Sequence, residues 1–135
     1  MKKISFNFLR VGLAVTFLWI GVLIFKQPAA WVGFIQPWAA ELLPVPLAQV
    51  MIGTAILDII IGAFLLFDFQ SWLAALFGAI HIAIVLAVSG ITEITVRDIG
   101  LLAACVAIMI ESMPPGVLNK IWFVKKQQMP ETGNS

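Results

Sequence analysis

The sequence predicts an all-α membrane protein, a four-transmembrane-helix antiparallel bundle, from two observations. Hydrophobic residues make up 61% of the 135 residues and charged residues only 11%, whereas soluble domains average about 45–50% apolar and about 25% charged residues. The apolar residues are gathered in four long, nearly uncharged stretches. A soluble fold of this size could not bury so much apolar surface.

The charge and the cysteine count narrow the class further. The net charge of +1 excludes a basic nucleic-acid-binding protein, and we expect no nucleic acid among the partners. The single cysteine, Cys105, allows neither an internal disulfide nor a cysteine cage for a metal. In apolar company in the middle of a helix, its thiol is expected to behave as a small hydrophobic group.

Four spans are expected, at residues 6–25, 47–67, 72–88 and 96–113. Twenty helical residues cover the roughly 30 Å of a membrane's hydrocarbon core. A cleaved signal peptide is the alternative for the first segment, but Arg10 interrupts it and no small-x-small site precedes Lys26. Thr95, followed by Asp98, has the spacing of a helix N-cap, which starts the fourth helix and gives Asp98 a structural role.

Two amphipathic segments flank these spans. In the outer connection, residues 27–46, four apolar residues are spaced like one face of a short interfacial helix: Trp31, Phe34, Ile35 and Trp38. An aromatic belt at the headgroups is favoured there over a binding platform. A cytoplasmic surface helix against anionic lipid is expected from Val117, Leu118, Ile121 and Trp122, flanked by Lys120, Lys125 and Lys126. The single domain then covers residues 1–128, and the polar tail, residues 129–135, is expected to be disordered.

The basic residues predict the orientation. Six would lie on one side of the membrane, namely Lys2, Lys3, Arg10, Lys120, Lys125 and Lys126, and only Lys26 and Arg97 on the other. The positive-inside rule then places both termini in the cytoplasm of a multi-pass protein of the cytoplasmic, or inner, membrane.

Asp58 and His81 are the first candidates for a functional pair. They lie at equal distances from the four-residue turn 68–71, so an antiparallel hairpin places them at the same depth. An unpaired charge inside a membrane is costly, and such residues are functional candidates by default. Two interpretations stay open: a proton-handling or ligand-orienting site, and a hydrogen-bonded strut between helices, which the lack of a second histidine favours.

Other polar residues form two further groups. Arg10 is expected to pair with Glu111 near the cytoplasmic face, or to extend to the headgroups instead. On the outer side a mouth of mixed charge is expected from Lys26, Glu93, Arg97 and Asp98. It could bind an anionic or quinone-like headgroup or a periplasmic partner, although solvated helix ends explain the same residues. No metal site and no catalytic residue are assigned.

Several short motifs carry a resemblance to a known family: Leu9-Arg10, Trp19-Ile20-Gly21 with Lys26, Leu57-Asp58 through Gly62, and Val96-Arg97-Asp98 through Leu102. Over Phe6 to Ser112 the chain resembles the DoxX/DoxD-like family of small four-helix prokaryotic membrane proteins. The family positions carried over are Arg10, Gly21, Lys26, Asp58 and Gly62. Many members have glutamate where this chain has Asp58, whose shorter side chain reaches less far.

The resemblance implies a role beside redox enzymes. Relatives include the small subunit of a thiosulfate:quinone oxidoreductase and membrane partners of enzymes that handle thiol and oxidative stress. We therefore expect an accessory membrane subunit of a quinone- or thiol-linked redox system, with a possible quinone ligand and no catalysis of its own, since the chain has no cysteine pair. The alternatives are a small oligomeric transport or permeation protein whose pathway is lined by Asp58, His81 and Arg10, and a membrane scaffold.

Overall fold

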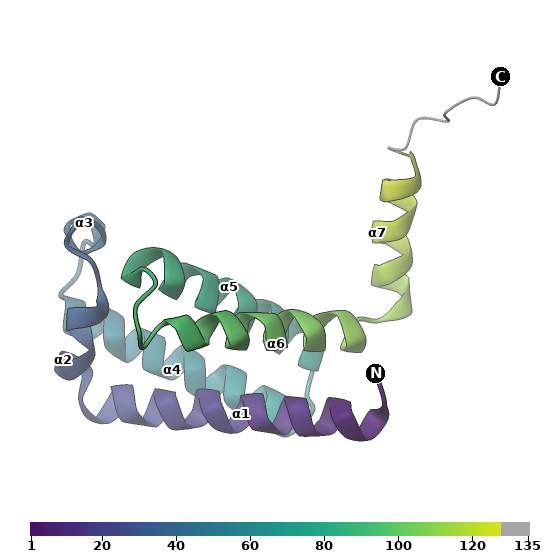
Figure 1. Ribbon diagram of the computed structural model, residues 1–135, viewed down its shortest axis with the longest axis horizontal. Helices are drawn as coiled ribbons and strands as arrows, with labels where there is room; N and C mark the ends of the chain where they lie inside the picture. Colours follow the sequence, from purple (N-terminus) through teal and green to yellow (C-terminus); the bar gives the residue numbers. More distant parts are fainter. Residues whose placement is uncertain (128–135) are drawn as a thin grey trace.

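The computed structural model describes residues 1–127 and is helical throughout its regular elements (Figure 1). Its four long helices are α1 (Lys3–Lys26), α4 (Leu47–Leu66), α5 (Ser71–Ser89) and α6 (Val96–Ser112). Each begins and ends within three residues of the span expected from the sequence. The polar tail, residues 129–135, lies outside the described residues.

The helices make a multi-pass membrane protein with three or four spans. Helices α1, α4 and α5 are each long and apolar enough to cross a membrane. Helix α6 has 17 residues, and with the first part of α7 (Pro115–Gln127) it forms a fourth candidate span that is bent by 105°. The bend lies at Pro114 and Pro115, where the sequence predicts the end of the helix. The N-terminus and α7 lie at the same end of the long helices (Figure 1), which we call the termini end.

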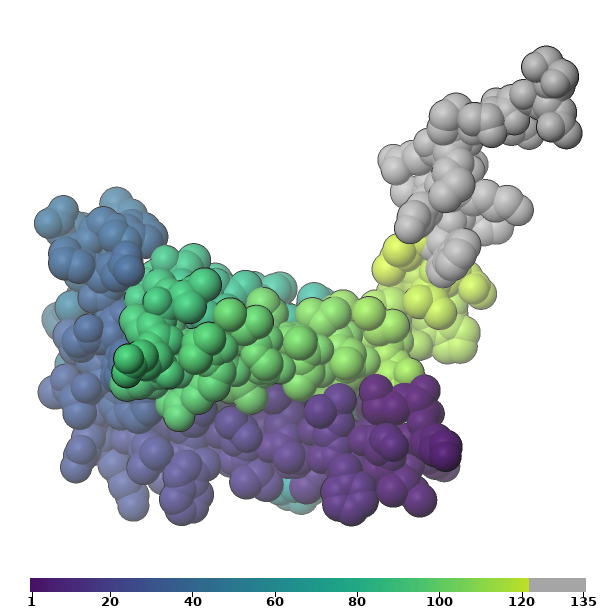
Figure 2. Space-filling model, in the orientation of Figure 1, coloured from purple at the N-terminus to yellow at the C-terminus, as the bar shows by residue number. Residues whose placement is uncertain are grey.

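Helix α1 packs chiefly against α4, and α5 packs chiefly against α6. Figure 2 shows α6 lying along α1 on one face of the molecule. The four helices converge at Gly78, where an added Cβ would lie 3.1 Å from Cys105 Sγ, 3.3 Å from Phe17 Cζ and 3.5 Å from Ile61 Cγ2. Only a very small residue therefore fits at this point. Cys105 is fully buried there.

The seam between α1 and α4 depends on two glycines. A Cβ at Gly62 would lie 2.9 Å from the backbone nitrogen of Leu18 and 3.0 Å from the carbonyl oxygen of Ala14. A Cβ at Gly21 would lie 2.9 Å from the carbonyl oxygen of Ala55. Small residues let membrane helices approach until their backbones touch. Gly21 and Gly62 therefore allow the close packing of α1 against α4.

The connection between α1 and α4 differs from the single interfacial helix that its aromatic spacing predicts. It consists of α2 (Pro28–Trp31), the 3-10 turn η1 (Val32–Phe34) and α3 (Pro37–Leu42). The cause is local: Gln36 adopts an extended conformation, and Pro37, whose fixed φ suits a first helical turn, starts a new helix there. Trp38 is consequently 51% exposed and does not share a face with Trp31 and Phe34. We call this end of the bundle the connection end.

The N-cap prediction for Thr95 is right about position and wrong about the hydrogen bond. Thr95 precedes α6, but its side chain does not cap the helix. Its hydroxyl donates to the carbonyl oxygen of Gly90 at 2.6 Å and accepts from the Thr92 backbone N–H at 2.8 Å. Thr95 has a helical rather than an extended backbone, so its hydroxyl closes the preceding loop instead.

Helix α7 forms where the basic amphipathic segment is expected. Val117 is half-buried, whereas Leu118 and Ile121 are exposed. The side chains of Trp122, Lys125 and Lys126, which belong to the same expectation, lie outside the described residues.

Candidate functional site

The connection end of the bundle contains a cavity of about 260 Å³. All four long helices contribute to its wall, which is mostly apolar. The connection forms its roof with five side chains: Trp31, Phe34, Ile35, Ala39 and Leu43. The cavity therefore lies inside the predicted membrane region, and its aqueous end is covered by apolar groups.

Asp58 and His81 meet in the wall of this cavity, as the hairpin geometry predicts. Their side chains are 5% and 11% exposed, and His81 Nε2 lies 3.1 Å from Asp58 Oδ1. Asp58 lies eight residues before the end of α4, and His81 eight residues before the end of α5, so both are near mid-helix. The seam glycine Gly21 lets α1 pack directly against the base of Asp58, since its Cβ would be 3.1 Å from Asp58 Cβ.

The pairing of Asp58 is incomplete. Its buried Oδ1 atom makes no hydrogen bond of good geometry within the described residues, although His81 Nε2 is close. A buried polar group without a partner costs about 1–3 kcal/mol, and a charged one costs more. Asp58 therefore contributes an incompletely hydrogen-bonded carboxylate to the residues that line the cavity.

Arg97 and Asp98 line the same cavity from the first turn of α6. Asp98 is half-buried and close enough for its charge to interact with those of Asp58 and His81. From the sequence, Asp98 is expected only at the mouth and in a structural role. Its spacing of three residues from Leu101 and seven from Cys105 places all three on one helix face, and this signal would have indicated an inward side chain.

The four charged residues that are expected to form a mouth on the outer side do not gather at one site. Arg97 and Asp98 line the cavity, whereas Glu93 borders a separate depression beside Gly33 and Pro37. Lys26 is exposed at the end of α1. Among residues 1–121, no ion pair joins any two of these four side chains.

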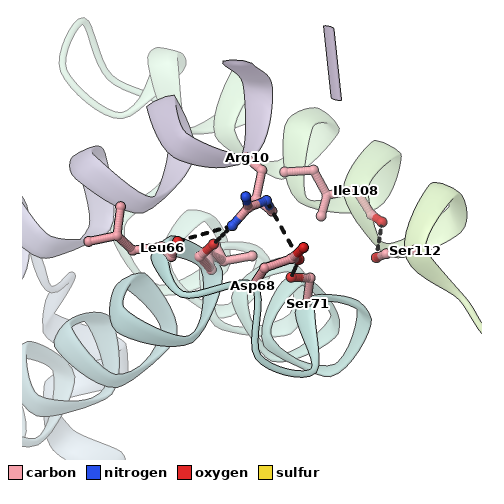
Figure 3. Close-up of polar contacts among 7 residues, drawn as sticks. Arg10, Leu66, Asp68, Ser71, Ile108 and Ser112 are labelled. Carbon is pink, nitrogen blue, oxygen red and sulfur yellow. Dashed lines mark hydrogen bonds and ion pairs between the residues drawn. The ribbon is translucent and has the colours of Figure 1, made fainter. Parts of the chain in front are cut away.

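Arg10 lies at the termini end and does not pair with Glu111, which corrects the prediction. Figure 3 shows its guanidinium directed toward the end of α4 and Asp68 instead. Its Nη1 donates to the carbonyl oxygens of Leu65 and Leu66, the latter at 3.1 Å, and its Nε lies 3.6 Å from Asp68 Oδ1. The last carbonyls of a helix lack intrahelical donors and carry the negative end of its dipole, so they attract a guanidinium. At 8% exposure Arg10 does not extend to the surface either.

Glu111 has a different partner. Its Oε1 accepts a hydrogen bond from the N-terminal ammonium of Met1 at 2.7 Å, in an exposed position. Arg10 is absent from the cavity wall. Within one chain, Asp58 and His81 therefore do not share a cavity with Arg10.

The roof and its attachment were not found from the sequence. The rings of Trp31 and Phe34 lie 5.6 Å apart and face the cavity, where an aromatic belt had been expected. Gln36 fastens the roof to α5: its backbone N–H donates to the carbonyl oxygen of Val88 at 3.0 Å, and its side-chain Nε2 donates to that of Ser89 at 3.4 Å. Gly90, with φ +71°, makes room for the Gln36 amide, since a Cβ there would lie 2.6 Å from Nε2.

In the part of the chain that the structure describes, no three His, Cys, Asp or Glu side chains gather as a metal site.

The chain matches no protein-family model, no curated protein and no solved structure. The fold and the cavity therefore provide the basis for a functional hypothesis.

Proposed function

We propose that this protein is an accessory membrane subunit of a redox system, similar to DoxX-like proteins, that holds a quinone-like molecule in the cavity at the connection end. One observation carries the proposal: Asp58, with an unused buried oxygen, and His81 stand together in the wall of an otherwise apolar cavity. Ligand sites are typically apolar cavities with a few convergent polar groups.

The chemistry of the cavity suits a ring that carries oxygen atoms. An imidazole can donate to or accept from a quinone or hydroquinone oxygen, and a carboxylate can accept from a hydroquinone hydroxyl. The volume of about 260 Å³ is just below the range of roughly 300–1,000 Å³ typical of small-molecule pockets, so it favours a single ring.

Any thiol chemistry of the system would be carried out by a partner protein and not by this chain. Cys105, the only cysteine of the chain, is fully buried where the four helices converge. A thiol there does not meet a substrate, so electron transfer to or from a thiol would be supplied by another subunit.

Transport is less well supported. Within a single chain the cavity does not reach Arg10, and three side chains that do not line it are fully buried: Leu65, Cys105 and Ile108. A scaffold without a ligand is also less well supported, because it gives no role to a polar pair in the wall of an apolar cavity.

A tryptophan in the cavity roof gives a direct test. We expect decylubiquinone, added to the protein in lipid nanodiscs, to quench tryptophan fluorescence in a saturable manner, because Trp31 lines the cavity. Trp31→Phe should remove the saturable component. The control is Trp19→Phe, since Trp19 is 68% exposed on α1 outside the cavity and should contribute only unsaturable quenching. Quenching that never saturates in the wild-type protein would contradict the proposal.

We also propose that both termini are cytoplasmic and that the connection faces the outside of the inner membrane. The asymmetry of basic residues supports this orientation, as does the position of the N-terminus and α7 at one end. Reporter fusions after α7 and within the connection test it. A C-terminal reporter active in the periplasm would overturn the orientation without affecting the cavity.

A further inference from the structure

We propose that the ligand of the cavity enters and leaves sideways through the membrane, past Ile84 on α5, and that it is an amphiphile whose apolar chain remains in the bilayer. This inference rests on the proposed function and adds to it the route of access and the class of ligand.

The roof covers the cavity on the side of the connection. Apolar side chains of the connection, Trp31, Phe34 and Leu43 among them, line the cavity from above. The roof is tied to α5 by the hydrogen bond from Gln36 N–H to the Val88 carbonyl oxygen. Ala39, between these groups, is only 5% exposed. A solute that entered through the connection would have to displace a fastened apolar layer.

One residue of the lateral wall links the cavity to the outer surface of the bundle. Ile84 is 55% exposed on α5 and also lines the cavity, so we infer that the opening to the membrane lies there. Ile80, one turn earlier on the same helix face, is 49% exposed but does not line the cavity. Ile84 lies five residues inside the end of α5, about 7.5 Å along the helix axis, and thus within the hydrocarbon region.

The position of the opening determines the class of ligand. An opening framed by apolar side chains in hydrocarbon admits an alkyl or prenyl chain and excludes charged solutes, whose desolvation is costly. Asp58 and His81 lie three or more residues deeper than Ile84 and would bind the polar head. The head would then sit at mid-membrane while the chain extends past Ile84 into the lipid.

The cavity has another exposed edge at Ile94 and Arg97, at the level where α6 begins. This edge offers the competing route. A ring without a chain could pass there, and the two routes make different predictions for a substitution at Ile84.

The test compares exchange rates of two probes in nanodiscs, measured by stopped-flow quenching of Trp31. The probes are decylubiquinone and 2,3-dimethoxy-5-methyl-1,4-benzoquinone, which lacks the chain. With the larger ring of Ile84→Phe, we expect about tenfold slower association and dissociation of decylubiquinone, as for a gated step. Ile84→Ala should make exchange faster than in the wild type, an effect that misfolding could not produce. The matched control, Ile80→Phe, should leave the rates unchanged.

The outcomes separate the route from the function. Saturable binding with equal decylubiquinone rates in Ile84→Phe and Ile80→Phe would overturn the lateral route and leave the proposed function intact. A total lack of saturable binding of both probes to the wild type would overturn the proposed function and this inference with it. Slower exchange in Ile84→Phe together with faster exchange in Ile84→Ala would support the route.

Discussion

The two ends of the bundle bury charged side chains in opposite ways. At the termini end, the Arg10 guanidinium has two carbonyl oxygens as hydrogen-bond acceptors and the Asp68 carboxylate nearby. At the connection end, the Asp58 carboxylate has only the His81 imidazole, and its Oδ1 lacks a hydrogen bond. Each charge has one buried atom without a hydrogen bond, Arg10 Nε and Asp58 Oδ1. The difference is that Arg10 Nη1 donates to two carbonyl oxygens, whereas Asp58 lines a cavity.

From this difference we expect the termini end to serve stability and the connection end to serve ligand binding. A buried charge that donates to two carbonyl oxygens is costly to remove, because its acceptors are then left without a donor. A polar pair in the wall of an apolar cavity, by contrast, is available to a ligand that enters the cavity. We therefore expect substitutions at Arg10 to affect folding and substitutions at Asp58 to affect binding.

The largest effect is expected for Arg10→Met. The carbonyl oxygens of Leu65 and Leu66 lose their charged donor, which should lower the free energy of unfolding by about 3 kcal/mol. Denaturant titration in detergent micelles measures it. The control is Asp68→Asn: Asp68 is 57% exposed, so the change should be no more than about 1 kcal/mol. The folded fraction of Arg10→Met should bind decylubiquinone as the wild type does. A large loss of affinity would show that Arg10 affects ligand binding as well as stability.

A smaller loss of stability is expected for Gly62→Ala. The new Cβ would meet the backbone of Leu18 and Ala14, which cannot move as a side chain could, so α1 and α4 must separate. We expect a loss of about 2 kcal/mol, within the range for overpacked sites. Gly53→Ala is the matched control on the same helix. No atom lies within 4 Å of its new Cβ, and alanine favours a helix over glycine by about 1 kcal/mol. An equal loss of stability in Gly62→Ala and Gly53→Ala would show that the close contact between α1 and α4 does not stabilise the bundle.

Asp58→Asn tests the connection end. The amide keeps a hydrogen-bonding partner for His81, so the unfolding free energy should stay within about 1 kcal/mol of the wild type. Affinity for decylubiquinone should fall about tenfold, which corresponds to about 1.4 kcal/mol. Asp58→Leu should be the more harmful to stability because the imidazole loses its partner. If both variants lose stability while the folded protein binds normally, the pair is a strut rather than a binding site.

The features predictable from the sequence are those set by local periodicity. Hydropathy located the long helices because a span must be apolar along its length. The meeting of Asp58 and His81 followed from a short turn and a constant rise per residue, which together fix the depth of every residue in a hairpin. Both predictions needed only the order of residues along the chain.

The features missed from the sequence depend on backbone groups and on packing between distant segments. The partners of Arg10 are carbonyl oxygens, which every residue carries, so no residue type marks them. The roof depends on a hydrogen bond between Gln36 and Val88, which lie 52 positions apart in the chain. The spacing of Trp31 and Trp38 predicts one helix, whereas the extended Gln36 and Pro37 at the start of α3 separate the two tryptophans into different helices.

The smallest effect is expected at Glu111, and it tests the correction to its pairing. The contact between Glu111 and the Met1 ammonium is 2.7 Å long but exposed, and pairs of this kind contribute about 0–1 kcal/mol. Glu111→Gln should therefore lower the unfolding free energy by no more than about 0.5 kcal/mol, and the difference should shrink at high salt because exposed charges are screened. The decisive measurement is a double-mutant cycle with Arg10→Met. Since Arg10 and Glu111 share no partner, the two effects should add to within about 0.5 kcal/mol. A coupling energy well above that would show that Arg10 and Glu111 interact, as the sequence predicts. Arg10 would then link α1 to α6 instead of to α4.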